Sequence, residues 1–186
     1  MIDLQNYILN RRCTLLGIGP MSKNCIDATI ELAEEHKAPL MMIASRRQID
    51  SKSLGGGYVN NWDTETLSNY VKNNDKNSNI FLSRDHGGPY QNNSEIENNL
   101  TLREAMQQSK KSFEDDIIND FKIIHIDPSI DINKKLGFEQ IFNRLIELYE
   151  FCIETARKNK KDILIEIGTE EQSGGTNSIE ELELSL

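Results

Sequence analysis

Residues 79–89, with the sequence NIFLSRDHGGP, contain the pattern that decides the fold. The stretch begins with a short apolar run, Asn79–Ser83, and continues at once into charged residues and glycines. A short apolar run of this kind is typical of a β-strand that is buried on both faces. Such runs occur at Cys13–Ile18, Leu40–Ala44, Asn79–Ser83, Lys122–Ile126 and Ile163–Ile167.

Segments with helical periodicity separate these runs. In Ser22–His36, for example, Ile26, Ile30 and Ala33 fall on one stripe, and Ser22 can cap the first turn. The same reasoning predicts helices that begin at Asp63 or Thr64, that run from about Ser94 or Thr101 to Ile118, and that cover Phe138–Lys158. The alternation of strand and helix predicts an α/β fold with a parallel sheet and right-handed crossovers.

Length and charge limit the classes of protein to which the chain can belong. A chain of 186 residues, 37% of them hydrophobic, is long enough for one domain with its own core. The net charge of −9 comes from 30 acidic and 21 basic residues that are spread along the sequence. A nucleic-acid-binding protein needs a basic face to meet the phosphates, so we expect no nucleic-acid partner.

The cysteines and the first residues indicate a cytoplasmic protein. Cys13, Cys25 and Cys152 lie far apart and show no CxxC spacing, which favours free thiols in a reducing compartment. The N-terminal sequence MIDLQNYILNRRC lacks the order of a signal peptide, and no run of about 18 apolar residues occurs. We therefore expect no membrane span.

Candidate binding residues follow the predicted strands, because loops converge at the carboxyl edge of a parallel sheet. After the second run, Arg46 is a candidate phosphate contact, since a guanidinium can hold a phosphate with two hydrogen bonds. A surface salt bridge is the alternative for this arginine. Gly56 and Gly57, which come next, either approach a ligand or simply turn a loop.

Asp85 and His86 follow the third run. An Asp-His pair at a strand end places an acid/base carboxylate beside an imidazole that can ligate a metal. Gly87 and Gly88 would let a ligand approach the backbone there. The alternatives are a cap or turn residue for Asp85 and a hydrogen-bonded loop histidine for His86.

The last two runs are also followed by polar residues. Asp127 and Ser129 come after the fourth run, and Glu170 comes after the fifth. Ionisable side chains at successive strand ends are costly unless they are paired or bind something. The sequence therefore predicts one binding rim, with substrate contacts from Arg46, Gly56, Gly57, Gly87, Gly88, Asp127, Ser129 and Glu170.

Together these segments resemble a known family. The matching segments are Ile43–Ser45 with Gly55–Tyr58, Asp85–Pro89, Lys122–Ser129, and Ile167–Glu170 with Gly174-Gly175. From about residue 13 to residue 175, their order and spacing are similar to those of the non-catalytic subunit of class II D-tagatose-1,6-bisphosphate aldolase. The resemblance implies a (β/α)8 barrel of TIM type, of which residues 1–186 would form the N-terminal part with about five of eight β/α units.

The resemblance also implies a function. Such subunits belong to ketose phosphate metabolism of the tagatose and galactitol type, often beside a catalytic aldolase subunit, and some relatives are regarded as sugar or sugar-phosphate epimerases. By analogy with zinc-dependent class II aldolases, Asp85 resembles the acid/base residue and His86 resembles one zinc ligand. No histidine follows His125, so the family's three-ligand zinc site cannot be completed here. We expect no tightly bound Zn²⁺ and no aldolase activity from this chain alone.

Two other interpretations stay open. The chain is either a purely structural subunit that stabilises a partner aldolase, or an open sheet of flavodoxin type that binds a phosphate ligand, although the Gly-rich first loop of such folds is missing. The barrel interpretation predicts that the strands lie in sequential order. It also predicts an exposed apolar edge at the first or fifth strand, through which the chain self-associates or pairs with another chain.

Overall fold

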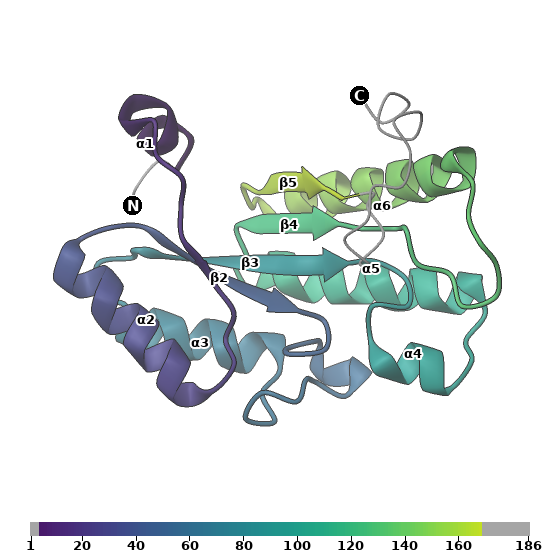
Figure 1. The fold of residues 1–186 in the computed structure, drawn as a ribbon, viewed down its shortest axis with the longest axis horizontal. Coiled ribbons are helices and arrows are strands. Elements are labelled where there is room, and N and C mark those ends of the chain that lie inside the picture. The colour runs from purple at the N-terminus through teal and green to yellow at the C-terminus, as the bar shows by residue number, and fades with distance from the viewer. Residues whose placement is uncertain (1–3, 169–186) are drawn as a thin grey trace.

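The computed structural model describes residues 4–168, and these residues form a single parallel sheet with helices packed on it (Figure 1). The strands lie side by side in the order of the sequence, β1-β2-β3-β4-β5. This order confirms the predicted parallel arrangement and differs from the flavodoxin order, in which the first two strands exchange places. The strands are β1 (Gly17–Ile18), β2 (Leu40–Ser45), β3 (Ile80–Gly87), β4 (Ile123–Ile126) and β5 (Leu164–Ile167).

Four long helices connect the strands, and their starts have the caps that the sequence provides. The Ser22 hydroxyl accepts a hydrogen bond from the Cys25 amide, as predicted, and Asp63 caps the next helix in the same way. Thr101 and Glu104 form a capping box. The helices are α2 (Lys23–His36), α3 (Thr64–Asn74), α5 (Leu102–Ile118) and α6 (Phe138–Asn159).

The main core lies between the sheet and these four helices. Alternate strand residues, such as Met42, Leu82 and Ile124, point toward the helices and are buried. They pack against residues of the helix stripes, such as Ile30 and Leu148. The predicted apolar stripes are therefore the helix faces that pack against the sheet.

A helix that the sequence did not predict covers part of the other face of the sheet. This helix, α1 (Leu4–Arg11), places Leu4 against Phe81 and Ile123, which alternate with the residues of the main core (Figure 1). Its sequence has a weak apolar stripe and carries no capping signal. The packing against two distant strands explains why it forms.

Three predicted boundaries need correction. The first strand contains only Gly17–Ile18, because the preceding residues connect α1 to the sheet. The third strand continues to Gly87 and thus includes Asp85 and His86, which were predicted to follow it. For the helix that ends at Ile118, the predicted start at Ser94 is wrong, because a separate helix, α4 (Asn93–Glu97), lies there, whereas the predicted start at Thr101 agrees with α5. A short 3-10 helix occupies Lys52–Leu54.

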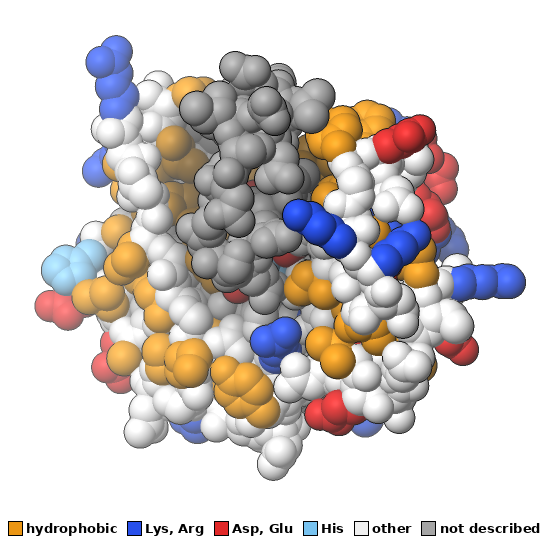
Figure 2. Space-filling model, turned by 45° about the vertical axis from the view of Figure 1, so that its right-hand side comes forward, with side chains coloured by type: hydrophobic (Ala, Val, Ile, Leu, Met, Phe, Trp, Pro, Cys, Tyr) orange, Lys and Arg blue, Asp and Glu red, His pale blue; other side chains and the backbone are white. Residues whose placement is uncertain are grey.

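The fifth strand and the neighbouring helix form an apolar flank. Ile167 is 57% exposed, which agrees with the apolar edge predicted at the fifth strand. Figure 2 brings this side of the molecule forward and shows groups of hydrophobic side chains between charged ones. On α6, the exposed side chains at helical spacing are Phe138, Phe142, Ile146 and Tyr149. None of the helices within residues 4–168 is long and apolar enough to cross a membrane.

Candidate functional site

The strand register brings the ionisable residues of β3 and β4 together. The pairing between these strands shifts between Arg84 and Gly87, and His86 has a left-handed backbone conformation with φ of 44°. The Asp127 amide, directly after β4, donates to the carbonyl of Gly87 over 2.7 Å. Consequently, Asp85 and Asp127 lie at the same carboxyl edge of the sheet, as predicted.

The His86 ring is held by Asp127. Nδ1 of His86 lies 2.9 Å from Oδ2 of Asp127, and the Gln91 side-chain amide donates to the same oxygen over 2.9 Å. The His86 backbone amide donates to Nδ1 of His125 over 3.3 Å. Because a carboxylate only accepts, we assign the proton of this contact to Nδ1 of His86, which leaves Nε2 on the side of Asp85, 3.8 Å from Oδ1.

Asp85 is the more exposed carboxylate of the cluster. Its contact with His125 is the main cause that lowers the pKa of Asp85; burial opposes this effect, and the nearby His86 ring adds to the lowering. Asp85 is therefore ionised at neutral pH and is suited to accept a proton or a hydrogen bond.

His125 is a site residue that the sequence analysis did not select. Its side chain is buried, and Nε2 has no hydrogen-bond partner among the described residues. A Cβ added at Gly168 would lie 2.1 Å from this atom, so the backbone directly after β5 passes beside it. The signal in the sequence was the alternation of β4, which places His125 on the same face as Asp85 in the neighbouring strand.

Asp127 has a supporting position rather than an exposed one. Its side chain is only 2% exposed, and its second oxygen, Oδ1, accepts from the Ser129 amide over 3.1 Å and from the Ser129 hydroxyl over 2.5 Å. Both residues were predicted as substrate contacts. In the structure, Asp127 orients His86, and Ser129 in turn orients Asp127.

Close packing of the protein itself explains three of the predicted binding glycines. A Cβ at Gly88 would lie 2.0 Å from the Asp127 carbonyl oxygen, and a Cβ at Gly87 would lie 2.2 Å from the Phe113 ring. At Gly57 the same atom would lie 2.0 Å from the Gln48 carbonyl oxygen. Gly56 has φ of 68°, a conformation that favours glycine in a turn.

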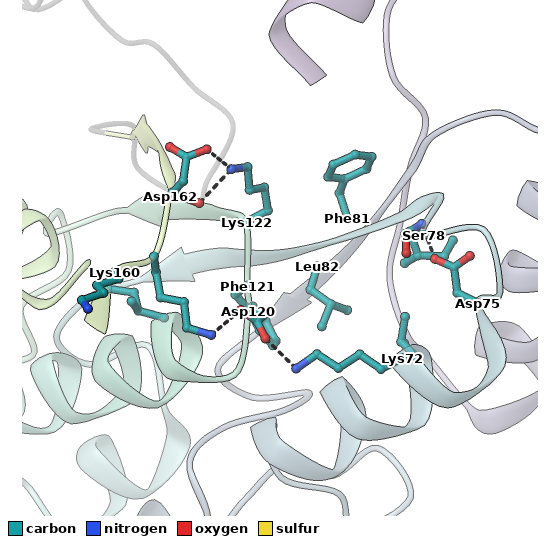
Figure 3. A pocket seen from close by; sticks show the side chains of 14 residues that line it. Lys72, Asp75, Ser78, Phe81, Leu82, Asp120, Phe121, Lys122, Lys160 and Asp162 are labelled. Atoms are coloured by element: carbon teal, nitrogen blue, oxygen red, sulfur yellow. Dashed lines mark hydrogen bonds and ion pairs between the residues drawn. The ribbon is translucent and has the colours of Figure 1, made fainter. Parts of the chain in front are cut away.

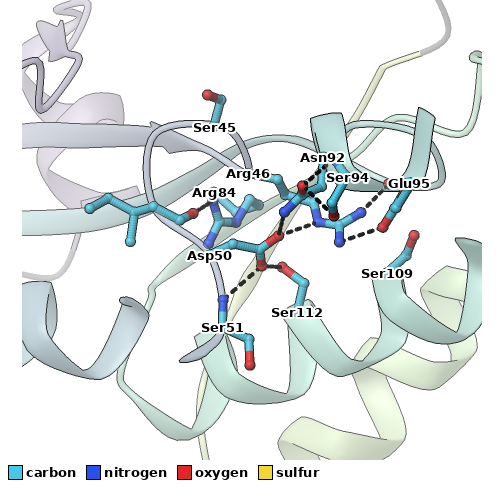
Figure 4. Close-up of polar contacts among 12 residues, drawn as sticks. Ser45, Arg46, Asp50, Ser51, Arg84, Asn92, Ser94, Glu95, Ser109 and Ser112 are labelled. Carbon is cyan, nitrogen blue, oxygen red and sulfur yellow. Dashed lines mark hydrogen bonds and ion pairs between the residues drawn. The ribbon is translucent and has the colours of Figure 1, made fainter. Parts of the chain in front are cut away.

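Arg46 does not occupy the surface position that a phosphate contact requires. Its side chain is fully buried on the helix side of the sheet, where it pairs with Asp50 over 3.0 Å and with Glu95 over 2.7 Å (Figure 4). It also donates to the Gly88 carbonyl over 2.8 Å. The predicted alternative, a salt bridge, is therefore what the structure contains, although it is buried. Its donors are occupied by the protein.

A second buried arginine lies beside this network. Arg84, on the helix side of β3, forms two hydrogen bonds with the carboxylate of Asp116 in α5, over 2.6 and 2.8 Å. It also donates to the carbonyls of Ala44 and Ile49 (Figure 4). Such pairs fix the position of α5 under the strand that contains Asp85 and His86.

The described residues do not fit a zinc site of the kind that the resemblance implies. Within residues 4–168, no group of three or more His, Cys, Asp or Glu side chains is placed to hold a metal ion. Nδ1 of His86 is taken by Asp127. Glu170, the remaining predicted contact, lies outside the described residues.

A cavity of about 470 Å³ lies at the opposite, amino-terminal end of the strands (Figure 3). Its floor contains the buried side chains of Leu82 and Phe121. Several of its charged groups pair with one another: Asp120 accepts from Lys72 over 2.6 Å and also from Lys161. None of the predicted site residues that the structure describes lines this cavity, so the candidate site is the carboxyl edge.

The fold and the cluster define a parallel β/α protein whose ionisable residues meet at the carboxyl edge of the sheet. The chain belongs to the family described as D-tagatose-1,6-bisphosphate aldolase subunit GatZ/KbaZ-like, whose model matches residues 5–185. This match confirms the resemblance seen in the sequence.

Among solved structures, the chain is similar to one described as a probable tagatose 6 phosphate kinase from Sinorhizobium meliloti 1021. The TM-score is 0.68 and the identity is 20%, a likeness that shows the fold alone. The match covers 85% of this chain but only 39% of the solved chain. A comparison with curated proteins found no significant match.

Proposed function

We propose that this chain forms part of the sugar-phosphate-binding rim of an aldolase-type barrel, and that it works in cytoplasmic ketose phosphate metabolism beside a catalytic aldolase subunit. The observation that supports this most strongly is the cluster of Asp85, His86, His125 and Asp127 at the carboxyl edge of the sheet. Membership of the family supplies the substrate class. In this proposal the five strands form one arc of the barrel.

The exposure of the cluster supports a binding role. The side chains of Asp85 and His86 are 37% and 30% exposed, whereas that of Asp127 behind them is almost fully buried. A sugar hydroxyl would donate to the Asp85 carboxylate, and a second sugar hydroxyl would donate to Nε2 of His86. Asp127 keeps the His86 ring in one orientation, as buried carboxylates do for functional imidazoles.

We assign no zinc-dependent step to this chain. The described residues lack the three ligands that a catalytic zinc site uses. Retro-aldol chemistry is therefore assigned to the partner subunit, while this chain contributes contacts to the sugar or stabilises the partner.

Isothermal titration calorimetry with D-tagatose 1,6-bisphosphate tests the proposal. We expect the wild-type chain to bind the bisphosphate more tightly than unphosphorylated D-tagatose. Asp85→Asn should weaken binding about tenfold or more, because a hydrogen bond to a charged group is lost. The matched control is Glu147→Gln, which removes one carboxylate from an exposed ion pair with Lys110 on the helix layer. Equal affinities for Asp85→Asn and the wild type would contradict the proposed site.

The purely structural interpretation predicts a different pattern. A subunit without a ligand site would raise the thermal midpoint and the retro-aldol rate of a co-expressed catalytic subunit, and Asp85→Asn would leave both unchanged. If Asp85→Asn lowers the rate of the mixed complex without lowering its thermal midpoint, the contribution is made at the sugar and not through packing.

A further inference from the structure

The loop between β3 and α4 is supported from below by buried charges. This loop, residues 87–92, has its backbone on one side against Asp127 and on the other side against Arg46. Arg46 donates to the Gly88 carbonyl over 2.8 Å, although the two residues are 42 positions apart in the sequence. Glu95, the partner of Arg46, accepts from the Tyr90 amide over 2.6 Å.

The loop needs such support because its backbone is strained. Tyr90 has φ of 63°, in the left-handed region that residues other than glycine rarely adopt. A conformation of this kind persists only where the surroundings hold it. The Tyr90 amide is held by Glu95, and the Tyr90 hydroxyl donates to the Leu100 carbonyl over 3.1 Å. The charged pair thus acts at the most strained residue of the loop.

The loop transmits its position to the candidate site. Gln91, directly after Tyr90, donates its side-chain amide to the same Asp127 oxygen that holds His86. Gly88 packs its Cα against the Asp127 backbone so closely that no Cβ fits between them. A shift of the loop would therefore move Asp127 and, with it, the His86 ring.

We propose that Arg46 and Glu95 are positioning residues: their buried ion pair holds loop 87–92 in the strained conformation that keeps Gln91 on Asp127 and His86 in its binding orientation. Both side chains are fully buried, and Figure 4 shows that they face each other beside Asp50 and Asn92. The part of this inference that concerns sugar affinity rests on the proposed function, whereas the part that concerns the loop does not.

The network also contains a matched control. Ser112 of α5 donates to Oδ1 of Asp50 over 2.7 Å, and Asp50 in turn pairs with Arg46. Ser112 is as buried as Glu95, but it reaches the loop only indirectly, through Asp50, whose Oδ2 accepts from the Asn92 side-chain amide over 2.9 Å. Ser112→Ala therefore removes a buried hydrogen bond of the same network without removing a contact to residues 87–92.

Amide hydrogen exchange tests the inference. In Glu95→Ala we expect the amides of residues 87–92, apart from Pro89, which has none, to exchange about tenfold faster or more, because a charged hydrogen bond to the Tyr90 amide is lost. The exchange rates of the β4 amides should rise only as far as the loss of global stability in the variant predicts. In Ser112→Ala, loop and β4 amides should change in parallel. Equal acceleration of the loop in both variants, or none in Glu95→Ala, would overturn the proposal.

A milder variant and a second readout complete the test. Glu95→Gln keeps an oxygen for the Tyr90 amide but removes the charge that faces Arg46, so we expect a smaller acceleration of the loop. Calorimetry should show weaker binding of D-tagatose 1,6-bisphosphate by Glu95→Ala than by Ser112→Ala. If the wild-type chain does not bind this sugar, the proposed function fails, and the exchange data still decide whether Glu95 positions the loop.

Discussion

Asp116→Asn tests whether the fold depends on the buried pair beneath β3. Asp116 and Arg84 are both fully buried, and the two hydrogen bonds between them are 2.6 and 2.8 Å long. Burial raises the pKa of Asp116, and the facing guanidinium opposes this rise, so each charge depends on the other. Asparagine keeps the size of the side chain and removes the charge, which leaves Arg84 buried without its counter-ion.

The expected loss of stability follows from this geometry. Removing one partner of a buried ion pair costs about 3–5 kcal/mol, because the remaining charge stays out of water. For a domain of this size, 1 kcal/mol corresponds to roughly 2–4 °C, so the thermal midpoint should fall by roughly 6–20 °C. Urea unfolding followed by circular dichroism at pH 7 measures the free energy directly.

The control for this experiment removes a carboxylate that water can reach. Glu147→Gln breaks the exposed pair with Lys110, and we expect a loss of about 0–1 kcal/mol. If Asp116→Asn costs less than about 1 kcal/mol, as the control does, then the buried pair does not hold α5 against β3 and our account of the core is refuted.

Three further predictions concern other parts of the chain. Burial opposes ionisation of Asp131, but hydrogen bonds from Arg144 and from a backbone amide outweigh this effect and lower the pKa of Asp131. The stability that this carboxylate contributes is therefore present above its ordinary pKa of about 3.9 and is lost as the pH falls through its lower folded value. Asp131→Asn should consequently destabilise the chain at pH 7 and much less near pH 2, as measured by urea titrations. Gly88→Ala should lower the free energy of unfolding by about 1–3 kcal/mol, because the added Cβ has no space beside the Asp127 carbonyl. In the control Gly137→Ala the added Cβ meets no atom, so the loss should be smaller. Equal losses of stability in thermal unfolding would argue against the tight contact at Gly88. Phe142→Ser removes a half-exposed ring from α6 and should reduce self-association in sedimentation equilibrium without lowering stability; a wild-type chain that stays monomeric at high concentration would contradict this prediction.

The order of the strands could be predicted because each apolar run is short, separate and followed by a segment with helical spacing. The position of Asp85 and Asp127 at one edge followed directly from that order. The sequence could not show that β3 extends through His86, because the shift in register depends on the neighbouring strand and on a left-handed residue that is not glycine. Only the folded chain reveals such pairing.

For Arg46 the sequence analysis left a phosphate contact and a surface salt bridge open, and it did not predict that the salt bridge would be buried. An arginine after a strand is usually exposed, and its sequence neighbours gave no sign that Glu95, 49 residues later, would supply the counter-charge. The glycines were read as approaches for a ligand, but three of them approach the protein's own backbone or a ring. Local sequence indicates that a close approach occurs; it does not indicate which group approaches.

The contact of α1 with the sheet has a consequence for the order of events during synthesis. Leu4 leaves the ribosome before Ile123, against which it packs and which is 119 residues further along the chain. At a synthesis rate of about 5–20 residues per second, roughly 6–24 s pass between the synthesis of Leu4 and that of Ile123. During this interval its apolar side chains are open to chaperones and to other nascent chains. A tag fused next to α1 would therefore alter a segment that is synthesised well before one of its packing partners.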